Sequence, residues 1–405
     1  MKKIKIETNI YLVFLIAFTL IFFKLNDLKI VAGLTKPWIR YLMIYSIMML
    51  LFNFLLKNTI KSFFDEKILK LLKFYWFYQI IIIIISLIDA NNYFDYKFIF
   101  ITYIPYLFLT LSIFLPLKIF NSFKLHDFFL KIYAPIILIL LVFFFRDNLI
   151  FYTRSNSFIY FFIVFFPFID TKKKIILTFF VLLIYFCEIN WRTNLLRVSL
   201  IFSIVMLYYI KVINSQNFLF LFKFLIILPI FFLFLSIFST FNLFDYLSIF
   251  FEKNREFFSD TRTFLFQATF NEIMINKLKL IFGYNLNSNL FIENFIFDNS
   301  YLYNVGRQNQ ESAFITKLYK TGLVGVFLDS LIFLVPGYYS IKYSNNDFSK
   351  LIGVLCGINY ILYFVEIPIG MNIDYFSIYF IIGIASLKEI RNKTNLELLS
   401  YFKDR

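Results

Sequence analysis

The sequence is short of the residues that most soluble enzymes use for covalent or metal chemistry. Its 405 residues include two cysteines and one histidine. Cys187 and Cys356 lie in apolar runs without CxxC or metal-ligand spacing, so we expect both to be packing residues. The sequence also lacks a P-loop, a dinucleotide-binding glycine motif and an Asp-x-Asp motif. We therefore expect neither a metal nor a cofactor.

Charged residues are also scarce. They make up 16% of the chain, whereas 60% of the residues are hydrophobic and the mean hydropathy is +0.76. A water-soluble domain is nearer half apolar and has no place to bury such an excess. The apolar residues come in blocks separated by short charged stretches, and a spanning helix needs about 20 mostly apolar residues. The sequence therefore predicts an all-α integral membrane protein.

The apolar blocks predict about 12 transmembrane helices. Residues 170–174 are all that separates the sixth helix from the seventh, so that pair is either a tight hairpin or wrongly divided. Ten or eleven helices with re-entrant pieces remain an alternative. The N-terminal helix follows basic residues like a signal peptide, but no small-x-small cleavage site follows it, and we expect it to be retained. The predicted ranges are 9–23, 38–56, 71–88, 98–116, 129–145, 157–169, 175–187, 194–210, 218–238, 318–341, 351–368 and 372–387.

The net charge of +15 is explained by the distribution of lysine and arginine. These residues concentrate in alternate loops, and positive residues collect on the cytoplasmic side of a membrane. We therefore expect a multi-pass protein of the bacterial inner membrane with both termini in the cytoplasm. Its surroundings are the lipid bilayer, and we expect no nucleic acid partner. The residues on the predicted cytoplasmic side are Lys2, Lys3, Lys5, Lys57, Lys61, Lys67, Lys70, Lys118, Lys124, Lys172, Lys173, Lys174, Lys211, Lys342, Lys350, Lys388, Arg391, Lys393, Lys403 and Arg405.

One long polar segment interrupts the series of helices. We divide the chain into transmembrane helices 1–9 (1–238), a large periplasmic loop (239–311), and C-terminal transmembrane helices with a cytoplasmic tail (312–405). Function concentrates in loops that a rigid scaffold holds, so the loop is where we expect a site. Within the tail, 388–405 is expected to be a solvated helix end.

The loop contains a predicted helix. Ser259 or Asp260 can cap its first N–H groups, and Arg262 then lies in the first turn. A cation there is unfavourable for the helix alone, and an anion bound at the helix N-terminus would reverse that effect. The alternative is a surface arginine that pairs with Asp260 or with lipid headgroups. The apolar positions predicted to share one face are Phe266, Phe270, Ile273 and Met274.

Glycines mark two further features. Gly283-Tyr284-Asn285 predicts a turn in which Gly283 has a positive φ. Gln310-Glu311 precede a helix that we expect to be interrupted near Gly322 and Gly325. Small residues there allow close helix approach, and a packing motif alone would explain both glycines.

Arginines gather on the predicted outer side. Arg197 falls about one turn inside the membrane, where a charge either marks a site facing the bundle interior or snorkels to the headgroups. Arginine forks match phosphate oxygens, so the expected ligand is anionic and lipid-linked, such as a polyprenyl pyrophosphate. The five residues are Arg192, Arg197, Arg255, Arg262 and Arg307.

The order of these features resembles the O-antigen polymerase (Wzy) and O-antigen ligase superfamily of polytopic membrane glycosyltransferases, similar to GT-C-type enzymes. The resemblance covers residues from about 190 to 330. Members often carry a histidine before the final helix where this sequence has Gln310-Glu311, and the one histidine, His126, lies on the predicted cytoplasmic side. That difference favours a polymerase over a ligase. The matching pieces are Arg192 or Arg197, Arg262, the helix 264–275, Gly283-Tyr284-Asn285, Gln310-Glu311 and Gly322-Leu323-Val324-Gly325.

The resemblance implies a substrate and residue roles. The substrate would be an undecaprenyl-pyrophosphate-linked oligosaccharide, polymerised into O-antigen of lipopolysaccharide or into capsule, with a chain-length regulator and a flippase as possible partners. Arg262 with Arg192 or Arg197 would bind pyrophosphate, and Glu311, Asp260 or Glu188 could accept the proton of the attacking hydroxyl. Arg255, Arg307, Gln310 and Asp260 are the expected substrate-binding residues. The alternatives are an O-antigen ligase and a flippase or other transporter. The absence of a repeat and the few charges in central helices count against the transporter.

Overall fold

The computed structural model describes residues 16, 45–51, 63–118, 126–144, 159–187, 192–238, 262–288, 312–365 and 373–403. Within these ranges the chain is helical and contains no β-strand. One isolated antiparallel bridge joins Phe64 to Leu387.

The helices of the N-terminal half include several irregular stretches. The run from Tyr93 to Lys118 passes through π-helical and 3-10 geometry, with Pro105 and Pro116 inside it. Proline lacks the N–H that a regular α-helix needs, which accounts for departures at these positions. The elements are α3 (Glu66–Ile88), α4 (Tyr93–Phe98), η1 (Ile99–Tyr103), α5 (Ile104–Leu109), η2 (Thr110–Lys118), η3 (Phe129–Tyr133), α7 (Ala134–Phe144), α9 (Ile159–Phe162), η4 (Ile163–Phe168), α10 (Thr171–Cys187) and α11 (Arg192–Tyr209).

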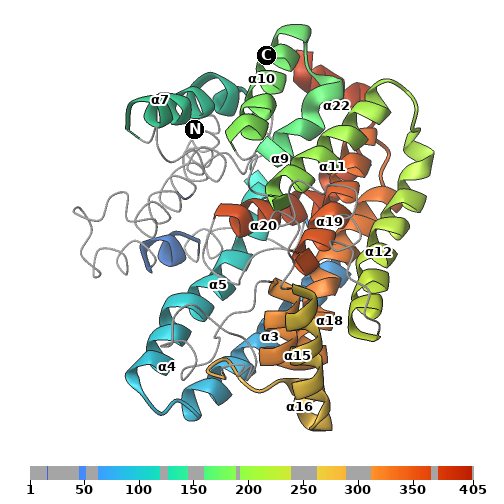
Figure 1. The fold of residues 1–405 in the computed structure, drawn as a ribbon. Helices are drawn as coiled ribbons and strands as arrows, with labels where there is room; N and C mark the ends of the chain where they lie inside the picture. The colour runs from blue at the N-terminus through green and yellow to red at the C-terminus, as the bar shows by residue number, and fades with distance from the viewer. Residues whose placement is uncertain are drawn as a thin grey trace, which may run out of the picture.

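The C-terminal half holds the longest helix, α18. Figure 1 shows α15 and α16 at one end of the bundle and α22 toward the other, with α18, α19 and α20 between them. The elements are η5 (Ser215–Asn217), α12 (Phe218–Phe238), α15 (Arg262–Met274), α16 (Lys277–Phe282), α18 (Ala313–Lys342), α19 (Asp347–Val365), α20 (Ile373–Ser386), α21 (Lys388–Asn392) and α22 (Asn395–Lys403).

Among the described residues, five helices are long and apolar enough to cross a membrane. They are Glu66–Ile88, Tyr93–Pro116, Ser215–Leu235, Ala313–Lys342 and Asp347–Phe364. Shorter apolar helices cover Ile159–Phe168, Leu196–Tyr209 and Ile373–Ser386. The chain therefore fits an all-α membrane protein, and the count of twelve crossings stays a prediction.

The exposed surface of the outer helices agrees with a membrane environment. Only 28% of the apolar window of α3 and 22% of that of Ser215–Leu235 are buried inside the protein, against 89% for Asp347–Phe364. Phe220, Phe224 and Phe231 of α12 are exposed, as are Phe74 and Phe77 of α3. Contiguous apolar surface of this kind is unfavourable in water and favourable in lipid. The helix α19 is thus central, and α3 and α12 are peripheral.

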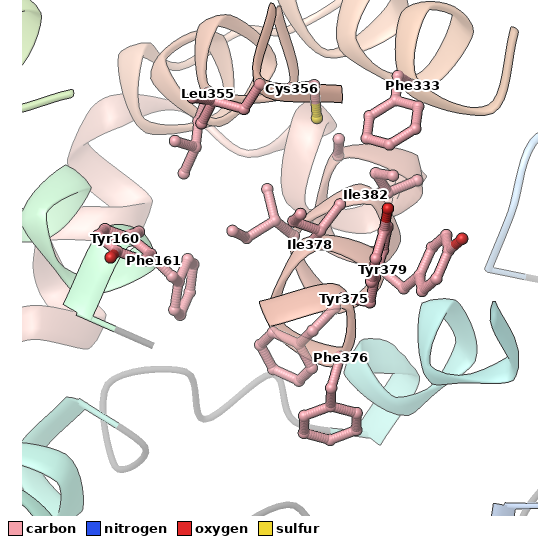
Figure 2. Packing of buried hydrophobic residues seen from close by; sticks show 14 of the residues in the cluster. Tyr160, Phe161, Phe333, Leu355, Cys356, Tyr375, Phe376, Ile378, Tyr379 and Ile382 are labelled. Atoms are coloured by element: carbon pink, nitrogen blue, oxygen red, sulfur yellow. The ribbon is translucent and has the colours of Figure 1, made fainter. Parts of the chain in front are cut away.

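The core is centred on α20. Figure 2 shows side chains of α20 between residues of α9, α18 and α19. Phe161 of α9 meets Phe380 edge to face at 5.7 Å between ring centroids. Cys356 of α19 is buried and free, as expected for a packing residue.

The expectation of a solvated C-terminal end was wrong for the first part of that segment. Arg391 is buried and pairs with Asp65, and Ile390 and Leu398 are buried as well. Asn346 donates to the carbonyls of Ile390 and Lys393 at 2.8 Å each. These contacts attach α21 to the bundle.

His126 was expected on the cytoplasmic side, which stays a prediction, and its side chain is buried in the protein. Its ring stacks on Phe165 at 5.1 Å, and the neighbouring Asp127 pairs with Lys173 at 2.7 Å. Burial lowers the pKa of His126 although Asp127 opposes the shift, so the imidazole is neutral in the fold.

Candidate functional site

The helix α18 is broken at Gly322. This residue has φ 67° and ψ −172°, which no α-helix contains, so α18 consists of a first arm (313–321) and a second arm (323–342). Twelve residues of a straight helix span about 18 Å. The Nζ of Lys317 nevertheless lies 3.4 Å from Oδ2 of Asp329, twelve residues later. The helix therefore kinks sharply at Gly322, and the predicted interruption is confirmed.

The turn after α16 lies directly against this break. Gly283 has the predicted positive φ, 82°, and Tyr284 N–H donates to the carbonyl of Tyr319 at 2.9 Å. The N–H of Asn285 donates to the carbonyl of Lys320 at 3.3 Å. These bonds satisfy carbonyls that the end of the first arm would leave free.

The predicted loop helix is present as α15, but Met274 is not on its buried face. Ile273 is fully buried, whereas Met274 is half exposed. The hydroxyl of Tyr284 donates to the carbonyl of Glu272 at 3.1 Å, which ties the turn to α15. Burial, with the nearby Glu272, raises the pKa of Tyr284, so its phenol stays a neutral donor.

Residues 285–287 also bind the end of α3. The N–H of Leu286 donates to Ser86 Oγ at 2.9 Å, and Asn287 Nδ2 donates to the Ser86 carbonyl at 2.6 Å. Asn285 Nδ2 donates to Asp89 at 3.0 Å. The turn is thus fixed to two helices, and it covers the end of the first arm.

Beneath the turn lies what we call the lysine–tyrosine cluster. Lys317 is fully buried, lies 3.4 Å from Gln79 Oε1, and sits over the ring of Tyr106 at 5.0 Å. Asp329 is 3% exposed and accepts a hydrogen bond of 3.1 Å from Tyr363. The cluster consists of Tyr75, Gln79, Tyr103, Tyr106, Lys317, Lys320, Asp329 and Tyr363.

Lys320 has a different environment from Lys317. Its Nζ donates to the carbonyl of Leu286 at 2.9 Å and lies 4.2 Å from the ring centre of Phe98 and 5.4 Å from that of Tyr103. The side chain is 1% exposed. Within the described ranges, no carboxylate lies within ion-pair distance of it. The amine of this buried lysine therefore faces a neutral carbonyl and two aromatic rings.

Arg197 is the one predicted site residue whose side chain the structure describes. It is 1% exposed, its Nη1 lies 3.3 Å from Oδ1 of Asp374, and its guanidinium lies 4.8 Å from the ring centre of Tyr160. Of the two readings of the sequence, snorkelling is excluded, because the side chain faces the bundle interior between α9 and α20.

The other predicted site residues are placed as follows. Arg192 and Arg262 are the first residues of α11 and α15, and the structure gives only their backbone positions. The expected carboxylate and substrate-binding residues lie outside the described ranges: Asp260, Glu188, Arg255, Arg307, Gln310 and Glu311.

Sequence reasoning did not select Lys317, Lys320 or Asp329. The predicted helix began at 318, so Lys317 fell outside it and Lys320 in its first turn, whereas α18 begins at Ala313. The apolar residues Ala313, Phe314 and Ile315 were the available signal for the earlier start. The expectation of few charges in central helices was wrong for this helix.

The described residues offer no metal site, since no three His, Cys, Asp or Glu side chains gather in that part of the chain. Comparison with known proteins adds no relative. No family model, no curated protein and no solved structure matches the chain. The resemblance drawn from the sequence therefore stays a prediction.

Proposed function

We propose that this protein is a polymerase that joins lipid-linked oligosaccharide repeat units on the periplasmic face of the bacterial inner membrane. A hydroxyl oxygen of one repeat unit attacks the anomeric carbon at the reducing end of a growing chain. The bond from that carbon to the pyrophosphate oxygen breaks, undecaprenyl pyrophosphate leaves with the bonding electrons, and a base takes the hydroxyl proton. The energy comes from the lipid pyrophosphate, so the protein has to orient two substrates and stabilise the leaving anion.

One observation carries the proposal. Two motifs of the sequence resemblance, Gly283-Tyr284-Asn285 and Gly322-Leu323-Val324-Gly325, lie almost 40 residues apart and are in direct backbone contact. The contact joins the polar loop to a broken helix that carries two buried lysines. An anionic substrate at the membrane surface needs this combination of a fixed loop and positive charge in a partly dry site.

Arg262 remains the proposed pyrophosphate ligand of the loop, because it begins α15 and helix N-termini favour anions. For Arg197 the proposed role in pyrophosphate binding is less direct than that of Arg262. Its contact with Asp374 orients it inside the bundle, next to the outer helix end where Arg192 begins α11.

The experiment that tests the proposal is a gel ladder of surface polysaccharide from a strain that lacks this gene, beside its parent. A polymerase predicts collapse to a single repeat unit on the lipid core. Full-length chains that stay on the carrier would instead identify a ligase. Lipid-linked units stranded inside the cell would identify a flippase, and an unchanged ladder would remove the protein from this pathway.

A specific observation favours the flippase or transporter as the second candidate. Transporters bind substrates at discontinuous helices with buried polar groups. Here α18 is discontinuous at Gly322 and holds the buried pair Lys317 and Asp329. The ladder separates the two functions, because loss of transport leaves no repeat units outside, whereas loss of polymerisation leaves single units there.

A further inference from the structure

The lysine–tyrosine cluster contains two buried lysines and one carboxylate. Lys317 has Asp329 as its carboxylate partner at 3.4 Å. Lys320, one turn further along the same arm, is equally buried and has no such partner among the described residues. A lysine ammonium that is buried without an opposite charge is unfavourable for the fold.

The contacts of Lys320 are those expected of an anion site in which a neutral backbone carbonyl stands in the place of the anion. Among the described residues its hydrogen-bond acceptor is the carbonyl of Leu286, which belongs to the turn that covers the first arm. Two further buried donors of the cluster, Tyr103 Oη and Gln79 Nε2, have no hydrogen-bond partner in the part of the chain that the structure describes. Buried polar groups are nearly always satisfied, so an unsatisfied donor indicates a missing ligand or water.

We propose that Lys320 binds the diphosphate of the substrate, and that this anion replaces the Leu286 carbonyl as the hydrogen-bond acceptor of Nζ. The inference rests on the proposed function and adds to it a ligand for the leaving group that the outer arginines alone do not supply. An ammonium group is a phosphate ligand in its own right, and its three donors suit an anion with many oxygens. The shared chemistry is a diphosphate anion, either lipid-linked or free.

Binding by the purified protein in detergent tests this inference. The probes are inorganic pyrophosphate, a polyprenyl pyrophosphate, and the polyprenyl alcohol of the same length. We expect both pyrophosphates to bind and to compete with each other, and the alcohol to bind at least tenfold more weakly than the lipid pyrophosphate. The variant Lys320→Met should weaken pyrophosphate binding by about ten- to a hundredfold, the value of one hydrogen bond to a charged group. Equal binding of alcohol and lipid pyrophosphate would contradict the proposal.

The matched control is Lys277→Gln, which removes one lysine charge from an exposed position in α16. It should leave binding unchanged. A second measurement separates binding from structure: because the amine of Lys320 is buried without a carboxylate partner among the described residues, Lys320→Met should keep or raise the melting temperature of the ligand-free protein. Unchanged pyrophosphate binding in Lys320→Met would overturn the proposal, whatever the melting temperature.

The ladder distinguishes failure of this inference from failure of the proposed function. If the strain without the gene accumulates single repeat units but Lys320→Met restores chains of parental length, the function stands and the role of Lys320 is wrong. If the ladder of the deletion strain is unchanged, the function itself is wrong. We expect Lys320→Met to be inserted normally and to leave single repeat units.

Discussion

Gly283 and Gly322 face each other with both backbones in the left-handed region of φ. A Cβ on Gly283 would overlap the backbone of Lys320, and a Cβ on Gly322 would overlap the carbonyl of Ile281. Side chains are strained at such φ values even in open space. The contact therefore requires glycine at both positions, and it holds the polar loop on the broken helix.

Gly322→Ala should therefore destabilise the protein. Strain at positive φ costs about 1–3 kcal/mol, and the overlap adds to it. The measurement is the thermal unfolding midpoint in detergent. Leu323→Ala, at a half-exposed neighbouring position, is the control and should change the midpoint much less. An unchanged midpoint in Gly322→Ala would show that the contact is not tight.

Asp329→Asn should destabilise the protein because it leaves Lys317 buried without its carboxylate. Breaking a buried pair by removing one partner costs about 3–5 kcal/mol, whereas replacing both by apolar residues is often neutral. The double variant Lys317→Met with Asp329→Leu should thus be more stable than Asp329→Asn. Equal losses of stability in the two variants would mean that Lys317 and Asp329 do not stabilise each other.

The buried pair of Arg197 and Asp374 predicts a similar loss of stability when its carboxylate is removed. Asp374→Asn removes the carboxylate 3.3 Å from Arg197 and should lower stability by about 3 kcal/mol. Glu66→Gln removes a carboxylate from an exposed ion pair and should have no measurable effect. If Asp374→Asn behaves like Glu66→Gln, Arg197 does not depend on this partner.

His126 predicts that acid weakens the fold. Burial lowers its pKa, so below the unfolded value, about 6.5, the unfolded chain binds a proton that the folded chain does not. The free energy of unfolding should therefore fall as the pH is lowered from 7.5 to 5.5. Thermal unfolding across this range should show a fall that His126→Gln lacks. The same fall in both proteins would assign the pH dependence to other groups.

Local signals predicted the local parts of the site. The cluster of Gly283, Tyr284 and Asn285 has few conformations open to it, so a turn with positive φ could be predicted. The break near Gly322 could be predicted because two glycines interrupt an apolar helix. The sequence also indicated Arg197 as an intramembrane charge, but its orientation depends on α9 and α20, which are distant in the chain.

The contacts across the break could not be predicted in this way. Lys317 and Asp329 are twelve residues apart, and a straight helix would hold them apart. Only the kink at Gly322 brings them together, and helical periodicity gives no angle for a break. The burial of Arg391 was missed for a related reason, because its partner Asp65 lies before α3 at the other end of the chain.

The measurement that tests the central claim most directly is elongation by the purified protein in liposomes, with undecaprenyl-pyrophosphate-linked repeat units as the only substrate. The account predicts oligomers of two and more repeats, with release of one undecaprenyl pyrophosphate for each new linkage. It also predicts that Arg262→Ala, inserted at the wild-type level, forms none. If the wild-type protein forms no oligomers but carries the intact lipid-linked unit across the bilayer, the protein is a transporter and the polymerase assignment is wrong.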